Sequence, residues 1–272
     1  MTLVQKVIKY LAIVFAIFLI ITIISGILSA FYALSGILGL NKNNETTTSN
    51  MSTTDFENNY IGILDIDVAY TNLTIKTGEF LKVETNNTNI SCKQSNQKLN
   101  IEENRHKWFS NHNDEELVIY IPENLEFEKV KINAGAGKIS IEKLRTKNLS
   151  FELGTGETKI ESLNVLNDCN IEGGTGIVDI LYGEINNLDL DMGVGEINLT
   201  ANITGRSDID ADIGKLNINM LGNKNDYKIK VDKGIGSIRI DGKEISNQAI
   251  YGNGENYIEI DGGIGSININ FE

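Results

Sequence analysis

The chain has 272 residues, which is enough for one large domain or two small ones. Its formal net charge of −13 excludes a surface that attracts nucleic acid, because acidic surfaces repel phosphates. The acidity keeps the protein soluble, and it would also attract cations or cationic partners.

An uncharged run over residues 10–40 predicts one transmembrane helix. A bilayer core of about 30 Å needs about 20 residues. The run exceeds the apolar core of about 7–15 residues of a secretory signal, although a cleaved signal is the alternative. Lys6 and Lys9 precede the run, so the positive-inside rule puts the N-terminus in the cytoplasm. We therefore expect residues 1–40 to be a cytoplasmic stub and transmembrane helix, and the protein to be a single-pass protein of the cell membrane.

The expected transmembrane helix carries small residues four positions apart, Gly26 with Ala30 and Ser29 with Ala33. Small residues at this spacing let membrane helices approach closely. A homodimer through this helix is therefore one expectation, although small residues are common in any membrane helix.

Residues 41–58 are almost free of apolar side chains and rich in Asn, Ser and Thr. Such a stretch buries too little surface to offset its ordering entropy. We expect a flexible polar linker here, followed by one extracytoplasmic domain over residues 59–272.

A glycine-centred triplet recurs through the C-terminal half of the chain, and its last glycines are 19, 20, 19, 19, 22 and 29 residues apart. The triplets begin at Gly135, Gly154, Gly174, Gly193, Asp212, Gly234 and Gly263. An apolar residue stands three positions before each triplet, and these residues are Ile132, Phe151, Ile171, Leu190, Ile209, Val231 and Ile260. Apolar and polar residues alternate on both sides, which is typical of half-buried strands.

Each repeat thus predicts a strand, a glycine bend, a second strand and a turn. One unit cannot bury its apolar face alone, but stacked units can. We expect an all-β domain, a parallel β-solenoid or β-helix of roughly 19–22-residue coils. An antiparallel meander rolled into a sandwich is the alternative. Residues 60–132 alternate without triplets, and we expect irregular early coils or an N-terminal cap there.

The two cysteines test this fold. Cys92 and Cys169 alternate with apolar residues and are expected to point inward. They are 77 residues apart, about four coils, so in a parallel solenoid the sulfurs should lie on the order of 19 Å apart along the axis. A disulfide needs Cα atoms within about 7 Å. We expect two free, buried thiols.

The segments GAGKISI, GVGEINL, GIGSIRI and GIGSINI combine the triplet with alternating aliphatic residues. In this, roughly over residues 60–272, the chain resembles the bacterial putative-adhesin family of β-strand-repeat proteins, a domain of unknown function. The resemblance implies binding at the cell envelope behind one membrane helix. Some members accompany envelope-stress systems. The resemblance implies no catalytic residues.

The glycines do not fit nucleotide or calcium motifs. A dinucleotide fingerprint needs a third glycine three positions after the second and then a helix, and no triplet has this glycine. A phosphate loop needs Gly-Lys followed by Ser or Thr, whereas Gly137-Lys138 is followed by Ile139. Calcium-binding nonapeptides need an aspartate that Val178 and Ile267 replace. We expect no cofactor.

The best candidate for a contact surface is the segment that holds His106, Trp108, Phe109 and His112. Exposed aromatic residues on loops often serve recognition. The two histidines with Asp114 could hold a metal, but a solvated loop between two strands is the better explanation and we expect no metal. The acids of the repeats stand at outward positions, as on a solvated face, so we expect no catalytic residues.

Together these features predict a membrane-anchored extracytoplasmic module that binds or scaffolds an envelope protein or polymer, as an adhesin does. A sensory accessory of an envelope-stress system is the alternative. A carbohydrate-active β-helix enzyme is a third option, which would need two carboxylates facing one cleft.

Overall fold

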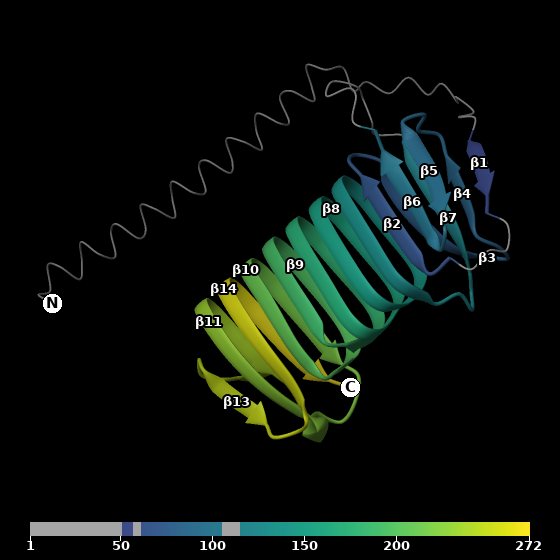
Figure 1. Cartoon of the computed structure of the whole chain (residues 1–272). Coiled ribbons are helices and arrows are strands. Elements are labelled where there is room, and N and C mark those ends of the chain that lie inside the picture. The colour runs from purple at the N-terminus through teal and green to yellow at the C-terminus, as the bar shows by residue number, and fades with distance from the viewer. Residues whose placement is uncertain (1–50, 57–60, 105–114) are drawn as a thin grey trace, which may run out of the picture. The chain divides into compact units, whose positions relative to one another are not determined.

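The computed structural model describes residues 51–56, 61–104 and 115–272, and most of these residues are in β-strands (Figure 1). The one helical element in these ranges is a 3-10 turn, η1 (Lys224–Asp226). None of the helical structure described there is long and apolar enough to cross a bilayer. The expected transmembrane helix and the expected contact residues His106, Trp108, Phe109 and His112 lie outside the described residues.

The domain is a stack of bent coils, each with one strand before a bend and one after it (Figure 1). The two coils nearest the N-terminus are built from pairs of short strands, which are β2 (Ile63–Val68) with β3 (Asn72–Gly78), and β6 (Lys98–Glu103) with β7 (Glu116–Pro122). The long strand β8 (Phe127–Asn186) winds through three coils. One coil each comes from β9 (Leu188–Thr204), β10 (Arg206–Met220), β11 (Tyr227–Ile240) and β14 (Asn256–Phe271).

Neighbouring coils pair in parallel and in register. Gly214 of β10 stands opposite Gly195 of β9 on one side and opposite Gly265 of β14 on the other. The same equivalence holds between Gly236 of β11 and Gly265. The prediction of a parallel β-solenoid is therefore confirmed, and the antiparallel sandwich is wrong for these coils.

Glycine is needed at the third triplet position because of both conformation and space. Gly195 has φ +153°, a region that L side chains rarely adopt. A Cβ on Gly195 would lie 1.9 Å from the carbonyl oxygen of Gly176 in the next coil. Stacking at the bend is thus so close that no side chain fits.

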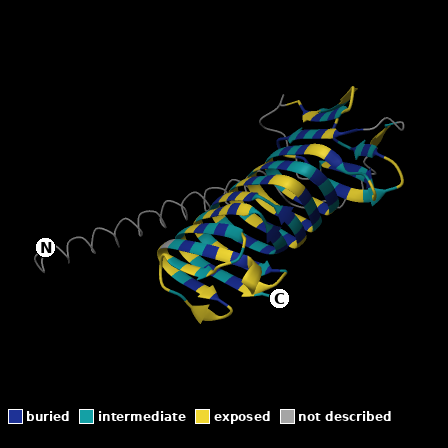
Figure 2. Ribbon diagram, turned by 60° about the horizontal axis from the view of Figure 1, so that its bottom comes forward, coloured by how far each residue is buried: buried dark blue, intermediate teal, exposed yellow. Residues whose placement is uncertain are grey.

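The predicted alternation of buried and exposed residues is visible as stripes along the coils (Figure 2). All seven apolar residues three positions before the triplets are buried, and together with the aliphatic residues after the bends they form one continuous core. Phe127, Phe151 and Tyr227 are the largest fully buried side chains.

The coils do not stack in chain order at either end, contrary to the regular order expected from the repeat. The last strand of the chain, β14, lies between β10 and β11. At the other end, the β2–β3 coil lies between the β6–β7 coil and the first coil of β8. The spacings of 22 and 29 residues between the last triplets accommodate this crossover and the hairpin strands inserted in it.

Short antiparallel strands cover the outermost coils. At the N-terminal end, β4 (Lys82–Thr85) pairs with β7, β5 (Ile90–Ser95) with β6, and β1 (Ser52–Asp55) with β4. At the C-terminal end, β12 (Lys243–Glu244) and β13 (Ala249–Gly252) pair with β11. Such strands blunt edges that would otherwise pair with other chains. β1 falls in the stretch expected to be a linker, and all four of its residues are exposed.

Both cysteines are free, as predicted. Cys169 is buried in the core column of β8, and burial raises the pKa of its thiol. Cys92 pairs with Ile101 at the edge strand β5 and is only half-buried, because no further strand covers that edge. The expectation of full burial is therefore wrong for Cys92.

Candidate functional site

One outward position carries an acidic residue in almost every coil. It lies two residues before the first triplet residue, and we call the set of these side chains the acid column. In the order of the stack, the acid column consists of Glu102, Asp67, Asn133, Glu152, Glu172, Asp191, Asp210, Asp261 and Asp232. With a spacing of about 4.8 Å between coils, the acid column is about 38 Å long. Eight of its nine members are acidic, and the exception is Asn133.

The acid column opposes the stability of the stack, because like charges directly opposite each other on neighbouring strands are destabilising. Partial burial, followed by repulsion from Asp208, Asp261 and Asp191, raises the pKa of Asp210 above its ordinary value. In the adjacent outward position, burial and then Glu259 and Asp261 raise the pKa of Asp208.

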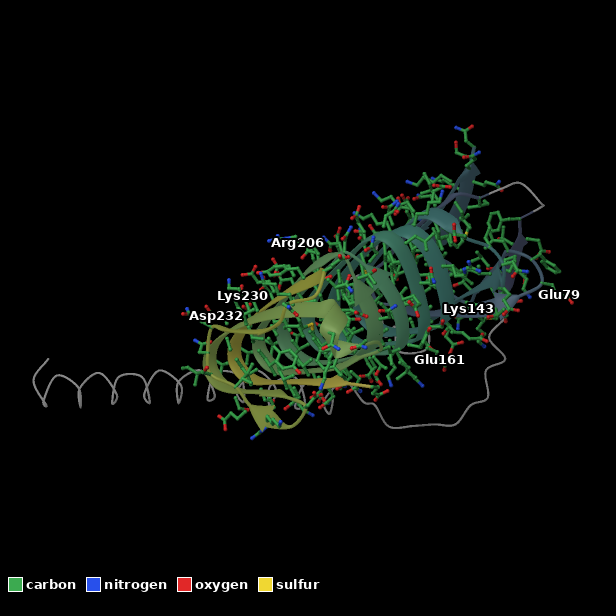
Figure 3. All side chains as sticks on the ribbon, turned by 90° about the horizontal axis from the view of Figure 1, so that it is seen from below. Glu79, Lys143, Glu161, Arg206, Lys230 and Asp232 are labelled. Atoms are coloured by element: carbon green, nitrogen blue, oxygen red, sulfur yellow. The ribbon has the colours of Figure 1, made fainter. Side chains whose placement is uncertain are left out.

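Cations neutralise this face only in part. Lys131 pairs with Glu152 at 3.0 Å, and Lys230 pairs with Glu259 beside the column. Figure 3 shows Lys230 and Asp232 on one flank of the stack and Glu161 on the opposite flank. Among the side chains that the structure describes, the aspartates of the acid column on the C-terminal coils form no ion pair with a cation.

The strand segments that follow the bends carry a different kind of residue at their outward positions. There Asn198 donates to Asp179 at 2.7 Å, Asn217 donates to Asn198 at 2.6 Å, and Asn268 donates to Asn217 at 3.0 Å. A ladder of amides satisfies itself from coil to coil, because each amide both donates and accepts. Carboxylates in the acid column accept only, so they cannot form such a ladder.

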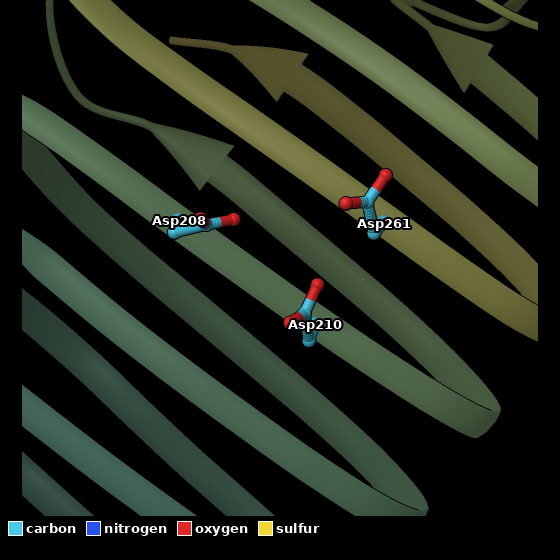
Figure 4. A group of neighbouring side chains, drawn as sticks. All are labelled: Asp208, Asp210 and Asp261. Atoms are coloured by element: carbon cyan, nitrogen blue, oxygen red, sulfur yellow. The ribbon is translucent and has the colours of Figure 1, made fainter.

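Asp208, Asp210 and Asp261 bring carboxylate oxygens within 4.8 Å of one another (Figure 4). Carboxylates suit hard cations such as Ca²⁺, which takes six to eight oxygen ligands. The three side chains are exposed and stand on two neighbouring strands. The backbone carbonyl oxygens of these strands are used in hydrogen bonds between strands, so they do not add ligands for a cation. We assign no metal to this group.

The residue in the middle of each bend forms a second line of side chains, which we call the bend ridge. In stack order from the β2–β3 coil, it consists of Tyr70, Ala136, Thr155, Thr175, Val194, Ile213, Ile264 and Ile235. The last four are aliphatic and in register, and they are 42%, 44%, 49% and 63% exposed. Exposed aliphatic side chains on four successive coils make a continuous apolar line rather than scattered surface residues.

Between the acid column and the bends runs an open groove of about 540 Å³ over the coils of β2, β8 and β9. Its acidic wall includes Asp67, Glu152, Glu172 and Asp191. Its floor consists largely of glycines, namely Gly135, Gly154, Gly173, Gly174 and Gly193. Because glycine has no side chain, the backbone of the bends is open to a ligand here.

The expected contact residues lie outside the described residues, but the chain on either side of them is described and lies beside the bend of the β2–β3 coil. Glu103, which precedes it, is 8% exposed and accepts hydrogen bonds from the backbone N–H groups of Ala69 (2.6 Å) and Tyr70 (3.2 Å). Asn87 Nδ2 donates to Thr71, Glu103 and Glu115 within 3.1 Å. This buried polar network fixes the bend that lacks the glycine triplet, so we assign it a structural role.

Sequence reasoning placed the acids outward but missed both the acid column and the bend ridge as surfaces. A signal was present: the four C-terminal coils each repeat Asp-x-x-Val or Asp-x-x-Ile across the bend. Its meaning depends on which coils are neighbours, and the crossover of β14 hides that order from the sequence.

Solved structures with similar folds include a putative cell adhesion protein from Clostridium sporogenes, with 17% identity, a TM-score of 0.40, and coverage of 82% of this chain and 99% of that one. Two others are a putative adhesin from Bacteroides fragilis (15% identity, TM-score 0.35, coverage 81% and 97%) and a putative lipid binding protein from Parabacteroides distasonis (13%, 0.38, 83% and 98%). These scores are too low to bear on function.

A comparison with curated proteins gave no match. The family model of Toastrack DUF4097 matches residues 61–256, which cover every coil from β2 to β11 and the start of β14. This match extends over most of the chain and includes the parallel stack apart from the β14 coil, which holds Asp261. The chain therefore belongs to the Toastrack DUF4097 family.

Proposed function

We propose that this protein is a non-enzymatic binding module of the bacterial cell envelope, held by one transmembrane helix at its N-terminus. The observation that carries the proposal is the acid column. It presents the same charge at the same place on eight coils, although in-register like charges oppose folding. The same position accepts asparagine in one coil, at Asn133, so the fold itself does not require an acid there.

A rigid stack suits recognition of an extended partner. The coils between the two ends are fixed by parallel pairing on both sides, so their outward side chains repeat at about 4.8 Å along the stack. Side chains held by such a framework lose little entropy on binding. The groove with its glycine floor offers a place for a linear ligand to lie along the stack.

The proposed location follows from the sequence. The uncharged run 10–40 is long enough to span a bilayer, and Lys6 and Lys9 favour an N-terminus inside. The polar stretch that follows would hold the stack away from the headgroups.

The absence of catalysis is part of the proposal. Hydrolysis of a glycoside needs two carboxylates on either side of the scissile bond. The described carboxylates of the acid column instead stand in single file on one flank of the stack.

Binding of the purified full chain to fractionated envelope material tests this function. Separate fractions of wall polymer, membrane vesicles and envelope proteins would be titrated against the immobilised protein, with unlabelled protein as competitor. We expect saturable, competed binding to one fraction without release of fragments from it. Absence of saturable binding to every fraction contradicts the proposal, and release of oligosaccharides would support the enzyme instead. Binding restricted to one membrane protein of a signalling system would favour the sensory accessory.

A further inference from the structure

The coils of β9, β10, β14 and β11 share a pair of outward-facing residues that the other described coils lack. Each has an aspartate in the acid column and a β-branched aliphatic residue in the bend ridge, three positions later. We call these four pairs the Asp–aliphatic patch: Asp191 with Val194, Asp210 with Ile213, Asp261 with Ile264, and Asp232 with Ile235. Both members are in register from coil to coil, so the patch is two parallel lines, one acidic and one apolar.

We infer that the Asp–aliphatic patch binds an extended segment of another polypeptide in which lysine or arginine alternates with aliphatic residues. The inference rests on the proposed binding function and names the chemistry of the partner.

The fold does not require this patch. In the β8 coils the bend ridge carries Thr155 and Thr175, and the acid column carries Asn133, with the same parallel stacking. The stack therefore accepts polar, uncharged residues at both lines. Ile235 is nevertheless 63% exposed, and Asp210 bears a pKa raised by partial burial and by its acidic neighbours. Neither an exposed aliphatic line nor a column of like charges stabilises the isolated domain.

The charge of the partner distinguishes the three candidates that could cover the apolar line, which are a second copy of this chain, a lipid surface and a basic peptide. A second copy carries the same net charge of −13, and like net charge opposes self-association. Anionic lipid headgroups would be repelled by the four aspartates beside the ridge. A basic amphipathic segment satisfies both lines at once, because its cations pair with the aspartates while its aliphatic side chains cover the ridge.

The dimensions fit an extended segment that lies along the stack. Four coils span about 14 Å, which is the length of about five extended residues. Successive side chains of an extended chain point to opposite sides. The basic residues can therefore face the aspartate line while the alternate residues face the aliphatic line.

A fluorescent seven-residue peptide of alternating lysine and valine, with lysine at both ends, is the probe. Its binding to the purified full chain in neutral detergent would be measured by fluorescence anisotropy. One comparison peptide replaces valine with serine, and another replaces lysine with glutamate. We expect the lysine–valine peptide to bind most tightly and the glutamate–valine peptide not to bind.

Two double variants separate the lines. Asp210→Asn with Asp261→Asn should weaken binding about threefold per charge removed, hence about tenfold together. Ile213→Thr with Ile264→Thr should weaken it by a similar factor and abolish the preference for valine over serine. The matched control, Glu142→Gln with Glu161→Gln, removes the same charge from the second strands of the β8 coils and should change affinity less than twofold. The natural Asn133 and Thr155 indicate that the patch variants fold, and thermal melting checks this.

Equal affinities of the control and both patch variants would overturn the inference. It would also be overturned if the serine and valine peptides bound equally, since that is attraction by charge alone. Self-association or binding to neutral vesicles that disappears with Ile213→Thr and Ile264→Thr would assign the ridge to a second copy or to lipid instead. If the envelope fractions bind while the peptide does not, the inference fails and the proposed function stands. If neither binds, both fail.

Discussion

Replacing Gly195 with alanine tests the structural basis of the bends. The new Cβ would stand 1.9 Å from the carbonyl oxygen of Gly176, and the φ of +153° would be strained for any L residue. Strained backbone costs about 1–3 kcal/mol, and the overlap forces neighbouring coils apart, where each lost hydrogen bond costs about 1 kcal/mol. We expect the free energy of unfolding to fall by about 3–5 kcal/mol. For a domain of this size that lowers the Tm by roughly 6–20 °C.

Two other glycines separate the contributions to that loss. Gly242→Ala has a φ of +71° but no atom within 4 Å of the new Cβ, so it isolates backbone strain. Gly193→Ala has no left-handed φ, and its Cβ would meet the oxygen of Gly174 at 2.9 Å, so it isolates a moderate overlap. Each should cost less than Gly195→Ala in chemical and thermal unfolding followed by circular dichroism. A Gly195→Ala variant as stable as either single-cause variant would refute the argument that conformation and space act together.

Further predictions concern the thiols, the acids and the buried network. Cys169 should resist alkylation until the protein unfolds, because burial raises the pKa of its thiol, whereas Cys92 should react slowly in the native state; equal native reactivity would contradict the packing. The folded-state pKa of Asp208 and Asp210 is raised, so the folded state binds protons first and stability should increase as the pH falls from neutral toward that raised pKa. Asp208→Asn with Asp210→Asn should be more stable than wild type at neutral pH and lack that part of the acid-induced gain, as measured by Tm against pH. Asn87→Ala removes the three hydrogen bonds that Nδ2 donates in the buried network and the one that Oδ1 accepts from the Asn89 backbone, and it should cost about 2–3 kcal/mol. Asn89→Ala, at a half-buried position of the same turn, is the milder control.

The coil and its core were predictable because both follow from local periodicity. The triplet spacing and the apolar residues such as Ile132 and Leu190 fix one bend and two strands per unit, whatever the neighbours are. The free cysteines follow from the same pattern. Half-burial of Cys92 does not, because it depends on β5 being the outermost strand on its side.

The order of the coils could not be predicted from the sequence. The segments around Gly236 and Gly265 carry almost the same pattern, so either could stack on β10. Their order depends on tertiary packing and on the η1 and β13 connections. The exposed Ile264 and Ile235 have the same residue type as the core, and only the geometry of the bend turns them outward.

The order of the coils is also the central claim, because it sets which residues of the acid column and of the Asp–aliphatic patch are direct neighbours. Cysteine cross-linking tests it in a background with Cys92→Ser and Cys169→Ser. Asp210→Cys with Asp261→Cys places the pair on neighbouring strands in register, about 4.8 Å apart and within the reach of a disulfide. Asp210→Cys with Asp232→Cys places the pair two strands apart, at about 10 Å, beyond that reach.

We predict that mild oxidation of the native protein cross-links the first pair and leaves the second pair free, as read by mass spectrometry of the intact chain. A bond between the cysteines at 210 and 232, with none between those at 210 and 261, would mean that the coils stack in chain order and would contradict the account.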